Sequence, residues 1–263
     1  MDTNKQKIHF ITFGDLKFKN SLKRIEQEAN NLGIFESVTI YTPENVSQEF
    51  YKKYNMVYNY ASTYDKNRGA GYMIWKFYII PKRLSEINEN DILIYLDAGC
   101  SINKNTESLK RINDYINILN NSDKGIISFE LPDACVEKRW TVLELLKHEN
   151  LDIDSEHSNT NQYLSGILIM KKCPHINLIF DKCIELIDKD PFIITDKYVK
   201  KNQELNAFFK DNRHDQSILS IIRKKYGSAA VLSDETVIQI NDRADWNHEW
   251  IKKMPFWATR IKQ

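Results

Sequence analysis

A single carboxylate follows the most apolar short segment of the chain. Residues 92–96 read ILIYL, a run of strand length, and Asp97 comes next on an Ala98-Gly99 turn. Ligands of open α/β sheets collect outside the carboxyl ends of the strands, so an acid at this position can hold a metal ion or a phosphorylated ligand. The alternative is that Asp97 only caps the turn, because Asp-Ala-Gly is also ordinary turn chemistry.

A glycine-hinged segment places cations beside aromatic rings. Residues 68–80 read RGAGYMIWKFYII, which brings Arg68 and Lys76 close to Tyr72 and Trp75 in the sequence. Aromatic rings can stack on a nucleobase, and Arg or Lys can pair with a diphosphate. The alternative is that the two rings belong to the apolar stripe of an amphipathic helix. Lys76 fits that alternative less well, since it lies between two aromatic residues.

A third candidate opens a helical segment near the C-terminal end. His214 and Asp215 directly precede an apolar-periodic stretch that extends to residue 226. Asp215 is either the N-cap of this helix, accepting a backbone N–H of the first turn, or a cleft residue that orients or deprotonates a hydroxyl. His214 beside it could titrate near neutrality.

The last part of the chain interleaves tryptophans with basic side chains. Such a set can close over a charged, partly flat ligand, or it can dock a terminal segment whose basic face stays in solvent. The residues in question are Trp246, His248, Trp250, Lys252, Lys253, Trp257 and Arg260.

Segments with strand and helix patterns alternate along the chain. Strands are expected at residues 7–13, 37–41, 92–96, 125–129 and 164–170, and helices at 16–32, 47–54, 69–84, 106–120, 141–148, 174–188 and 215–226. This alternation predicts a single α/β domain, with a mainly parallel central sheet and helices on both of its faces. No internal repeat or linker interrupts it.

Composition narrows the possible functions. Apolar residues make up 42% of the 263 and charged ones 28%, which is enough apolar material for a packed core. The formal charge of +1 argues against a nucleic-acid binder, which normally carries a concentrated basic surplus. The glycines at positions 69 and 71 do not make a dinucleotide fingerprint, since Ile74 takes the third glycine position. P-loop, GxSxG and HExxH motifs are absent from the sequence.

The cysteines and the apolar segments bear on location. Four cysteines without a CxxC pair suggest reduced thiols, and the N-terminal residues do not look like a signal peptide, so we expect a cytoplasmic protein. No apolar run approaches the roughly 20 residues that span a bilayer. Peripheral association with a membrane, through a partner or a lipid-linked substrate, stays open.

Taken together, these segments resemble the GT-A-type glycosyltransferases, which have the nucleotide-diphospho-sugar transferase fold. The small bacterial and viral enzymes of capsular or surface polysaccharide synthesis are the most similar in kind. The resemblance covers most of the chain. It is carried by Thr12-Phe13-Gly14 after the first strand and by GAGYMIWKFYII, ILIYLDAGC, EKRWTVLELL, QYLSGILIMKK, RHDQSILSII and PFWATRIK.

The resemblance implies roles for particular residues. Asp97 matches the first acid of the D-x-D motif that holds Mn²⁺ or Mg²⁺ in such enzymes, but Gly99 replaces the second acid, which puts metal dependence in doubt. His248 would be a further metal ligand. The donor site would comprise Thr12, Phe13, Gly14, Arg68, Tyr72, Trp75, Lys76, Asp97, Ala98, Gly99, Gln162, Ser165, His214 and Arg260. The candidate catalytic carboxylates are Asp215, Asp97 and Glu130, and Lys138 is a further candidate.

The function that the resemblance implies is transfer of a sugar from a nucleotide-diphosphate donor to a hydroxyl of a glycan or lipid-linked acceptor. Residues from about 228 to 263 would close over the donor site. Two alternatives keep the fold: a sugar-1-phosphate nucleotidyltransferase and a non-catalytic nucleotide-sugar or carbohydrate-binding protein. The first is disfavoured, because residues 13–16 offer one glycine and an acid where such enzymes carry a basic, glycine-rich phosphate loop.

Overall fold

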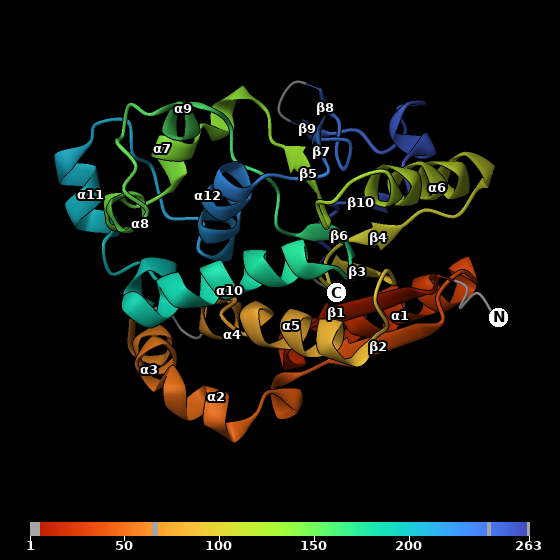
Figure 1. The fold of residues 1–263 in the computed structure, drawn as a ribbon, viewed down its shortest axis with the longest axis horizontal. Helices are drawn as coiled ribbons and strands as arrows, with labels where there is room; N and C mark the ends of the chain where they lie inside the picture. The colour runs from red at the N-terminus through yellow and green to blue at the C-terminus, as the bar shows by residue number, and fades with distance from the viewer. Residues whose placement is uncertain (1–5, 65–67, 241–242, 262–263) are drawn as a thin grey trace.

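The computed structural model describes residues 6–64, 68–240 and 243–261, which form an α/β fold around a six-stranded sheet (Figure 1). The strand order is β2-β1-β3-β6-β5-β7. The bounds of these strands are β1 Ile8–Phe13, β2 Ser37–Tyr41, β3 Ile92–Leu96, β5 Ile126–Glu130, β6 Ile167–Lys171 and β7 Ala230–Ser233.

One strand of the sheet runs against the others. β1 pairs in parallel with β2 and β3, and β5 in parallel with β7, whereas β6 is antiparallel to both β3 and β5. The prediction of a mainly parallel sheet is therefore confirmed. Because β6 is reversed, the residues that precede it, Ser165 and Gly166, lie at the edge where β1 and β3 end.

Helices cover both faces of the sheet, as predicted (Figure 1). α5 (Lys76–Glu86), α10 (Pro174–Lys189) and α12 (Asp215–Tyr226) pack on one face, and α1 (Lys19–Leu32) and α6 (Thr106–Asn120) on the other. All five residues of β3 and of β6 are buried. A strand covered on both faces has no polar side, so β3 and the first four residues of β6 read as continuous apolar runs rather than as alternating ones.

Short elements complete the fold, and several of them were not predicted. The remaining helices are α2 Gln48–Lys53, α3 Asn55–Tyr64, α4 Gly69–Tyr72, α7 Glu137–Trp140, α8 Leu143–His148, α9 Glu156–Asn159 and α11 Val199–Leu205. The 3₁₀ helices are η1 Leu16–Phe18, η2 Pro43–Asn45, η3 Asp133–Cys135, η4 Pro191–Ile194 and η5 Ile251–Lys253. The short strands are β4 Ser101–Ile102, β8 Gln239–Ile240, β9 Arg243–Ala244 and β10 Phe256–Trp257. Sequence periodicity missed α3 because this helix fully buries only Val57 and Ala61.

The helix predicted at residues 69–84 is wrong in its first part. Gly69, Ala70, Gly71, Tyr72 and Met73 all have positive φ, between 50° and 96°, so the segment labelled α4 is a left-handed turn. The regular helix, α5, begins only at Lys76. Left-handed backbone costs roughly 1–2 kcal/mol for each residue other than glycine. Tertiary contacts must offset that cost. The apolar pattern of the sequence does not reveal such contacts, so it predicted a regular helix here.

The C-terminal segment is anchored beside the Asp97 turn. β10 pairs antiparallel with β4, and Thr259 Oγ1 and the Ile261 N–H both donate to the carbonyl of Gly99, at 2.8 and 2.9 Å. Trp257 stacks on Trp246 with 5.7 Å between ring centroids, and its indole N–H donates to the carbonyls of Ile251 and Met254. Trp246 and Trp257 thus pack within the terminal segment itself, whereas Trp250 is exposed.

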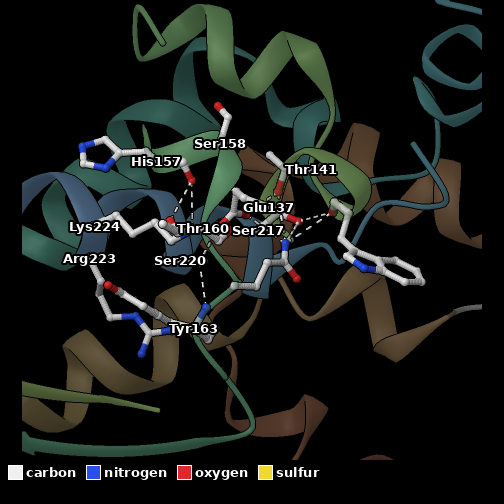
Figure 2. Close-up of polar contacts among 12 residues, drawn as sticks. Glu137, Thr141, His157, Ser158, Thr160, Tyr163, Ser217, Ser220, Arg223 and Lys224 are labelled. Carbon is white, nitrogen blue, oxygen red and sulfur yellow. Dashed lines mark hydrogen bonds and ion pairs between the residues drawn. The ribbon is translucent and has the colours of Figure 1, made fainter. Parts of the chain in front are cut away.

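A buried polar network fixes α12 against the middle of the chain (Figure 2). The Glu137 side chain is fully buried and accepts hydrogen bonds from Thr141 Oγ1, Ser220 Oγ and Gln162 Nε2, at 2.5, 2.5 and 2.9 Å. It also forms an ion pair with Lys224, at 2.9 Å between Nζ and Oε2. Ser220 and Lys224 belong to α12, so this network holds the helix that begins with Asp215.

Within the described part of the chain, we find no helix with the length and apolar character needed to cross a bilayer.

We predict that Glu137→Gln destabilises the protein by about 3–5 kcal/mol, because it leaves the ammonium of Lys224 buried without its counter-charge. The Lys224 side chain is only 2% exposed, which leaves it little solvent to compensate. Urea unfolding would measure the change. Glu36→Gln is the matched control, since Glu36 pairs with Lys7 on the surface, and it should change stability little. Equal stability of the two variants would contradict a stabilising role for the buried pair.

A second prediction concerns the left-handed turn. Gly71→Ala places a methyl group on a residue with φ of 96°, and that Cβ would clash with the ring of Tyr58. Gly33→Ala is the control, since Gly33 has φ of 76° but no Cβ contact closer than 3.9 Å. We expect a loss of about 1–2 kcal/mol for Gly33→Ala. Gly71→Ala should lose a further 1–3 kcal/mol or so from overpacking. Thermal and urea unfolding of both variants would test the difference.

Candidate active site

A cavity of about 440 Å³ opens at the edge of the sheet where β1 and β3 end. Most of the residues predicted for the site line it: Phe13, Gly14, Arg68, Trp75, Asp97, Ala98, Gly99, Ser165, His214, Asp215 and Arg260. They come from the ends of β1 and β3, the left-handed turn before α5, the start of α12, the residues before β6 and the C-terminal segment. Its size and position are those of a small-molecule site in an α/β fold.

Asp97 directs its carboxylate into this cavity. Half of its side-chain surface is exposed, and Oδ1 accepts a hydrogen bond from the Tyr95 hydroxyl at 2.5 Å. The Asp97 N–H donates to the Gly166 carbonyl at 2.8 Å, and a Cβ on Gly166 would lie 2.9 Å from Asp97 Oδ2. Glycine at position 166 therefore leaves the carboxylate room. The carboxylate is bound by a buried phenol rather than by the backbone of its own turn.

A buried ammonium joins Asp97 to Asp215. Lys76 is 1% exposed and donates to Asp215 Oδ2 at 2.5 Å and to the Ser165 carbonyl at 3.1 Å, with Asp97 Oδ1 at 3.5 Å. Ser165 Oγ donates to the same oxygen of Asp215 at 2.8 Å. The side chain of Asp215 therefore forms hydrogen bonds with Lys76 and Ser165 across the site. It does not cap α12, so the alternative that Asp215 is only a helix cap is wrong.

The charges of this group shift the proton affinities of its members. Burial lowers the pKa of Lys76, but the carboxylates of Asp215 and Asp97 outweigh it, so the pKa is raised and the ammonium persists. Loss of hydration raises the pKa of Asp97; the charge of Lys76 opposes this shift and that of Asp215 adds to it. Asp97 is therefore a stronger proton acceptor than an ordinary surface aspartate.

Sequence reasoning allowed His214 to titrate near neutrality, but its burial disfavours the charged imidazolium. Burial lowers its pKa below the ordinary 6.5, so the imidazole is neutral at pH 7. Nδ1 lies 2.8 Å from the Ile194 carbonyl, which makes this nitrogen the donor. The residue has φ of 55°, a strained value outside glycine, and its ring packs against Tyr72 at 5.0 Å.

The aromatic residues expected to stack on a base lie differently. Trp75 stacks on Phe13 with 3.7 Å between centroids, so that face of the indole is taken, and its N–H donates to the Gly69 carbonyl. Tyr72 is fully buried in the core and does not line the cavity. The left-handed turn is the cause, since it directs Tyr72 inward and leaves Gly69 and Met73 at the cavity wall.

Five more predicted residues lie outside the cavity lining. Thr12 and Lys76 are buried behind it, and Gln162 belongs to the Glu137 network. Glu130 ends β5, two strands away from β3. His248 is exposed, and its Nδ1 accepts from the backbone of Trp250.

The further candidate Lys138 also lies outside the lining and pairs with Asp154 at 3.4 Å.

Sequence reasoning missed several residues of the lining, notably Lys17, Arg213 and Gln216. Arg213 and Gln216 flank His214 and Asp215 in the sequence, and that adjacency was the available signal. Gln216 Nε2 donates to Gln162 Oε1 at 2.8 Å, which connects the cavity wall to the buried Glu137.

The donor set does not fit a divalent cation. At a nucleotide site such a cation is held by one or two carboxylates together with the substrate phosphates. Over the described ranges, no three His, Cys, Asp or Glu side chains are grouped so that they could hold a metal. The structure does not bring His248 to Asp97, and the oxygens of Asp215 and Asp97 that face Lys76 are already compensated by its ammonium.

Comparisons with known proteins show similarity of structure. No protein-family model and no curated protein sequence matches the chain. The apo structure of the bifunctional glycosyltransferase WbbM is 10% identical, with a TM-score of 0.50 over 88% of this chain and 39% of that one. A glycosyltransferase involved in glycosylation of the major capsid of PBCV-1 is 12% identical, with a TM-score of 0.47 over 95% of this chain and 91% of that one.

The glycosyltransferase GlyE of Streptococcus pneumoniae TIGR4 is 13% identical, with a TM-score of 0.43 over 88% of this chain and 46% of that one. The chain thus spans less than half of the GlyE and WbbM chains. At these identities the similarity concerns the fold alone, and the comparison with WbbM carries it. The strand order, the helices on both faces and this match together show that the chain has the fold of the GT-A-type glycosyltransferases.

Proposed function

We propose that the protein transfers a sugar from a nucleotide-diphosphate donor to a hydroxyl of a glycan or lipid-linked acceptor, in the synthesis of a surface polysaccharide. One observation carries the proposal. At the carboxyl edge of the sheet, a half-exposed carboxylate of raised pKa, Asp97, faces a cavity that is also lined by three arginines. A proton acceptor beside a cationic surface is what displacement of a diphosphate by a hydroxyl requires.

The reaction assigns a task to each part of the site. The acceptor oxygen forms a bond to the anomeric carbon of the sugar while the bond from that carbon to the diphosphate oxygen breaks, and the hydroxyl proton passes to Asp97. The nucleoside diphosphate leaves with additional negative charge, which cationic side chains offset. Asp215 accepts hydrogen bonds from Lys76 and Ser165, and it thereby holds the Lys76 ammonium next to Asp97.

A divalent cation has no step in this proposal, because the donor set does not fit one. The nucleotidyltransferase alternative is weakened by the end of β1. Gly14 is followed by Asp15, whose carboxylate accepts from the Lys17 N–H at 2.9 Å, so this turn presents an acid rather than a basic phosphate loop.

We further propose a cytoplasmic location, at the inner face of the membrane when the acceptor is lipid-linked. All four cysteines are free thiols, which suits a reducing compartment.

Hydrolysis of the common UDP- and GDP-sugars, with and without an acceptor, tests the proposal. We expect the wild type to release nucleoside diphosphate. Asp97→Asn should lower kcat by about 10²-fold or more, since the carboxylate that takes the proton is lost. Asp114→Asn, at a half-exposed aspartate on α6, is the control and should keep full activity. Thermal unfolding of each variant verifies the fold.

Other outcomes would replace the proposal. Pyrophosphate release from a nucleoside triphosphate and a sugar phosphate would make the protein a nucleotidyltransferase. Tight binding of a nucleotide sugar without turnover, across a panel of acceptors, would make it a binding protein. Unchanged kcat in Asp97→Asn would show that another group accepts the proton.

A further inference from the structure

The cavity lining carries more cationic than acidic side chains. Four of the lining residues are cationic: Lys17, Arg68, Arg213 and Arg260. Arg68 pairs with Asp196 at 3.0 Å and with Asp211 at 3.7 Å. Arg213 and Arg260, in contrast, have no ion pair to any acid in the described ranges. Three acids share the lining: Asp97 and Asp215 are joined to Lys76, and Asp15 accepts a hydrogen bond from the Lys17 N–H.

The position of Arg213 is electrostatically unfavourable in the free protein. Its guanidinium stacks on Trp140, 4.0 Å from the ring centroid, and is half-buried. Burial lowers its pKa, the charges of Arg260 and Arg68 also lower it, and those of Cys135 and Asp211 raise it. All three arginines line the same cavity. An anion placed among them would offset their like charges, and at Arg213 it would meet a half-buried guanidinium that packs against Trp140.

The C-terminal segment brings Arg260 to the place of the missing acid. A Cβ on Gly99 would lie 3.3 Å from Arg260 Cα and 3.4 Å from the Ile261 carbonyl oxygen, so position 99 has little room for a side chain. The hydrogen bonds from Thr259 and Ile261 to the Gly99 carbonyl hold the segment there. Because position 99 is glycine, the main chain of Arg260 can pack against it, and this segment carries a cation. An aspartate at position 99 would instead place an anion there as a metal ligand.

We infer that Arg213 and Arg260, together with Arg68, bind the diphosphate of the donor and neutralise the leaving nucleoside diphosphate in place of a divalent cation. The inference rests on the proposed function. Guanidinium forks match phosphate oxygens in pairs, and the charge of the half-buried Arg213 acts more strongly than it would at the surface. The site would then bind nucleoside diphosphates without metal, with an affinity that falls as salt rises.

Calorimetric binding of UDP and of GDP, in EDTA and in Mn²⁺, tests the inference without relying on turnover. In EDTA we expect binding by the wild type, with an affinity within about twofold of that in Mn²⁺. Arg213→Gln and Arg260→Gln should each weaken it by about tenfold or more, since a charge-assisted hydrogen bond contributes about 1.5–3 kcal/mol. Arg243→Gln, on the exposed strand β9, is the control and should bind as the wild type does. Thermal unfolding without ligand shows whether each variant is folded.

Gly99→Asp supplies a second test, because it restores the missing acid. We expect it to weaken nucleotide binding in EDTA and not to create a manganese requirement, since the new side chain meets the backbone of Arg260. A rise in affinity of at least tenfold on adding Mn²⁺ to the wild type would overturn the inference while leaving the proposed function intact. Wild-type binding in EDTA that neither Arg213→Gln nor Arg260→Gln weakens would also overturn it. Failure to bind any nucleoside diphosphate, with or without Mn²⁺, would overturn both.

Discussion

The ammonium of Lys76 organises the site. It is buried, and it lies between the two aspartates that sequence reasoning selected, 2.5 Å from Asp215 and 3.5 Å from Asp97. A charge of this kind is tolerated in a protein interior only with partners in close geometry. Both carboxylates and the Ser165 carbonyl supply those partners. The starts of α5 and α12 and the end of β3 are thereby fixed relative to one another, and the cavity takes its shape from them.

The reversed strand β6 has a similar consequence for the cavity wall. Because it runs antiparallel to β3, the residues that precede it reach the edge where β1 and β3 end. Ser165 there donates to Asp215, and Gly166 leaves space for the Asp97 carboxylate. A wholly parallel sheet would present the start of this strand at the opposite edge. The architecture therefore assembles the site from segments far apart in the chain.

Gly99 affects both metal binding and the position of the C-terminal segment. A D-x-D pattern provides two acids after the strand, whereas here the second position lies under the main chain of Arg260. The absence of an acid at position 99 and the presence of Arg260 beside it are thus linked in the structure. Both make the local charge more positive, which favours binding of a diphosphate. The partial burial of Arg213 against Trp140 extends the same cationic wall.

The sequence by itself determined the strands β2 and β3, the helices α6 and α12, and the position of Asp97 at the end of a strand. These depend on local apolar periodicity and on turn residues, which are visible within a window of some ten residues. Only the tertiary structure decided the left-handed turn at Gly69–Tyr72, the inward position of Tyr72, the union of Lys76 with Asp215 and the approach of Arg213 and Arg260. Those features come from contacts between residues far apart in the chain, and such contacts override local backbone preference without leaving a periodic pattern in the sequence.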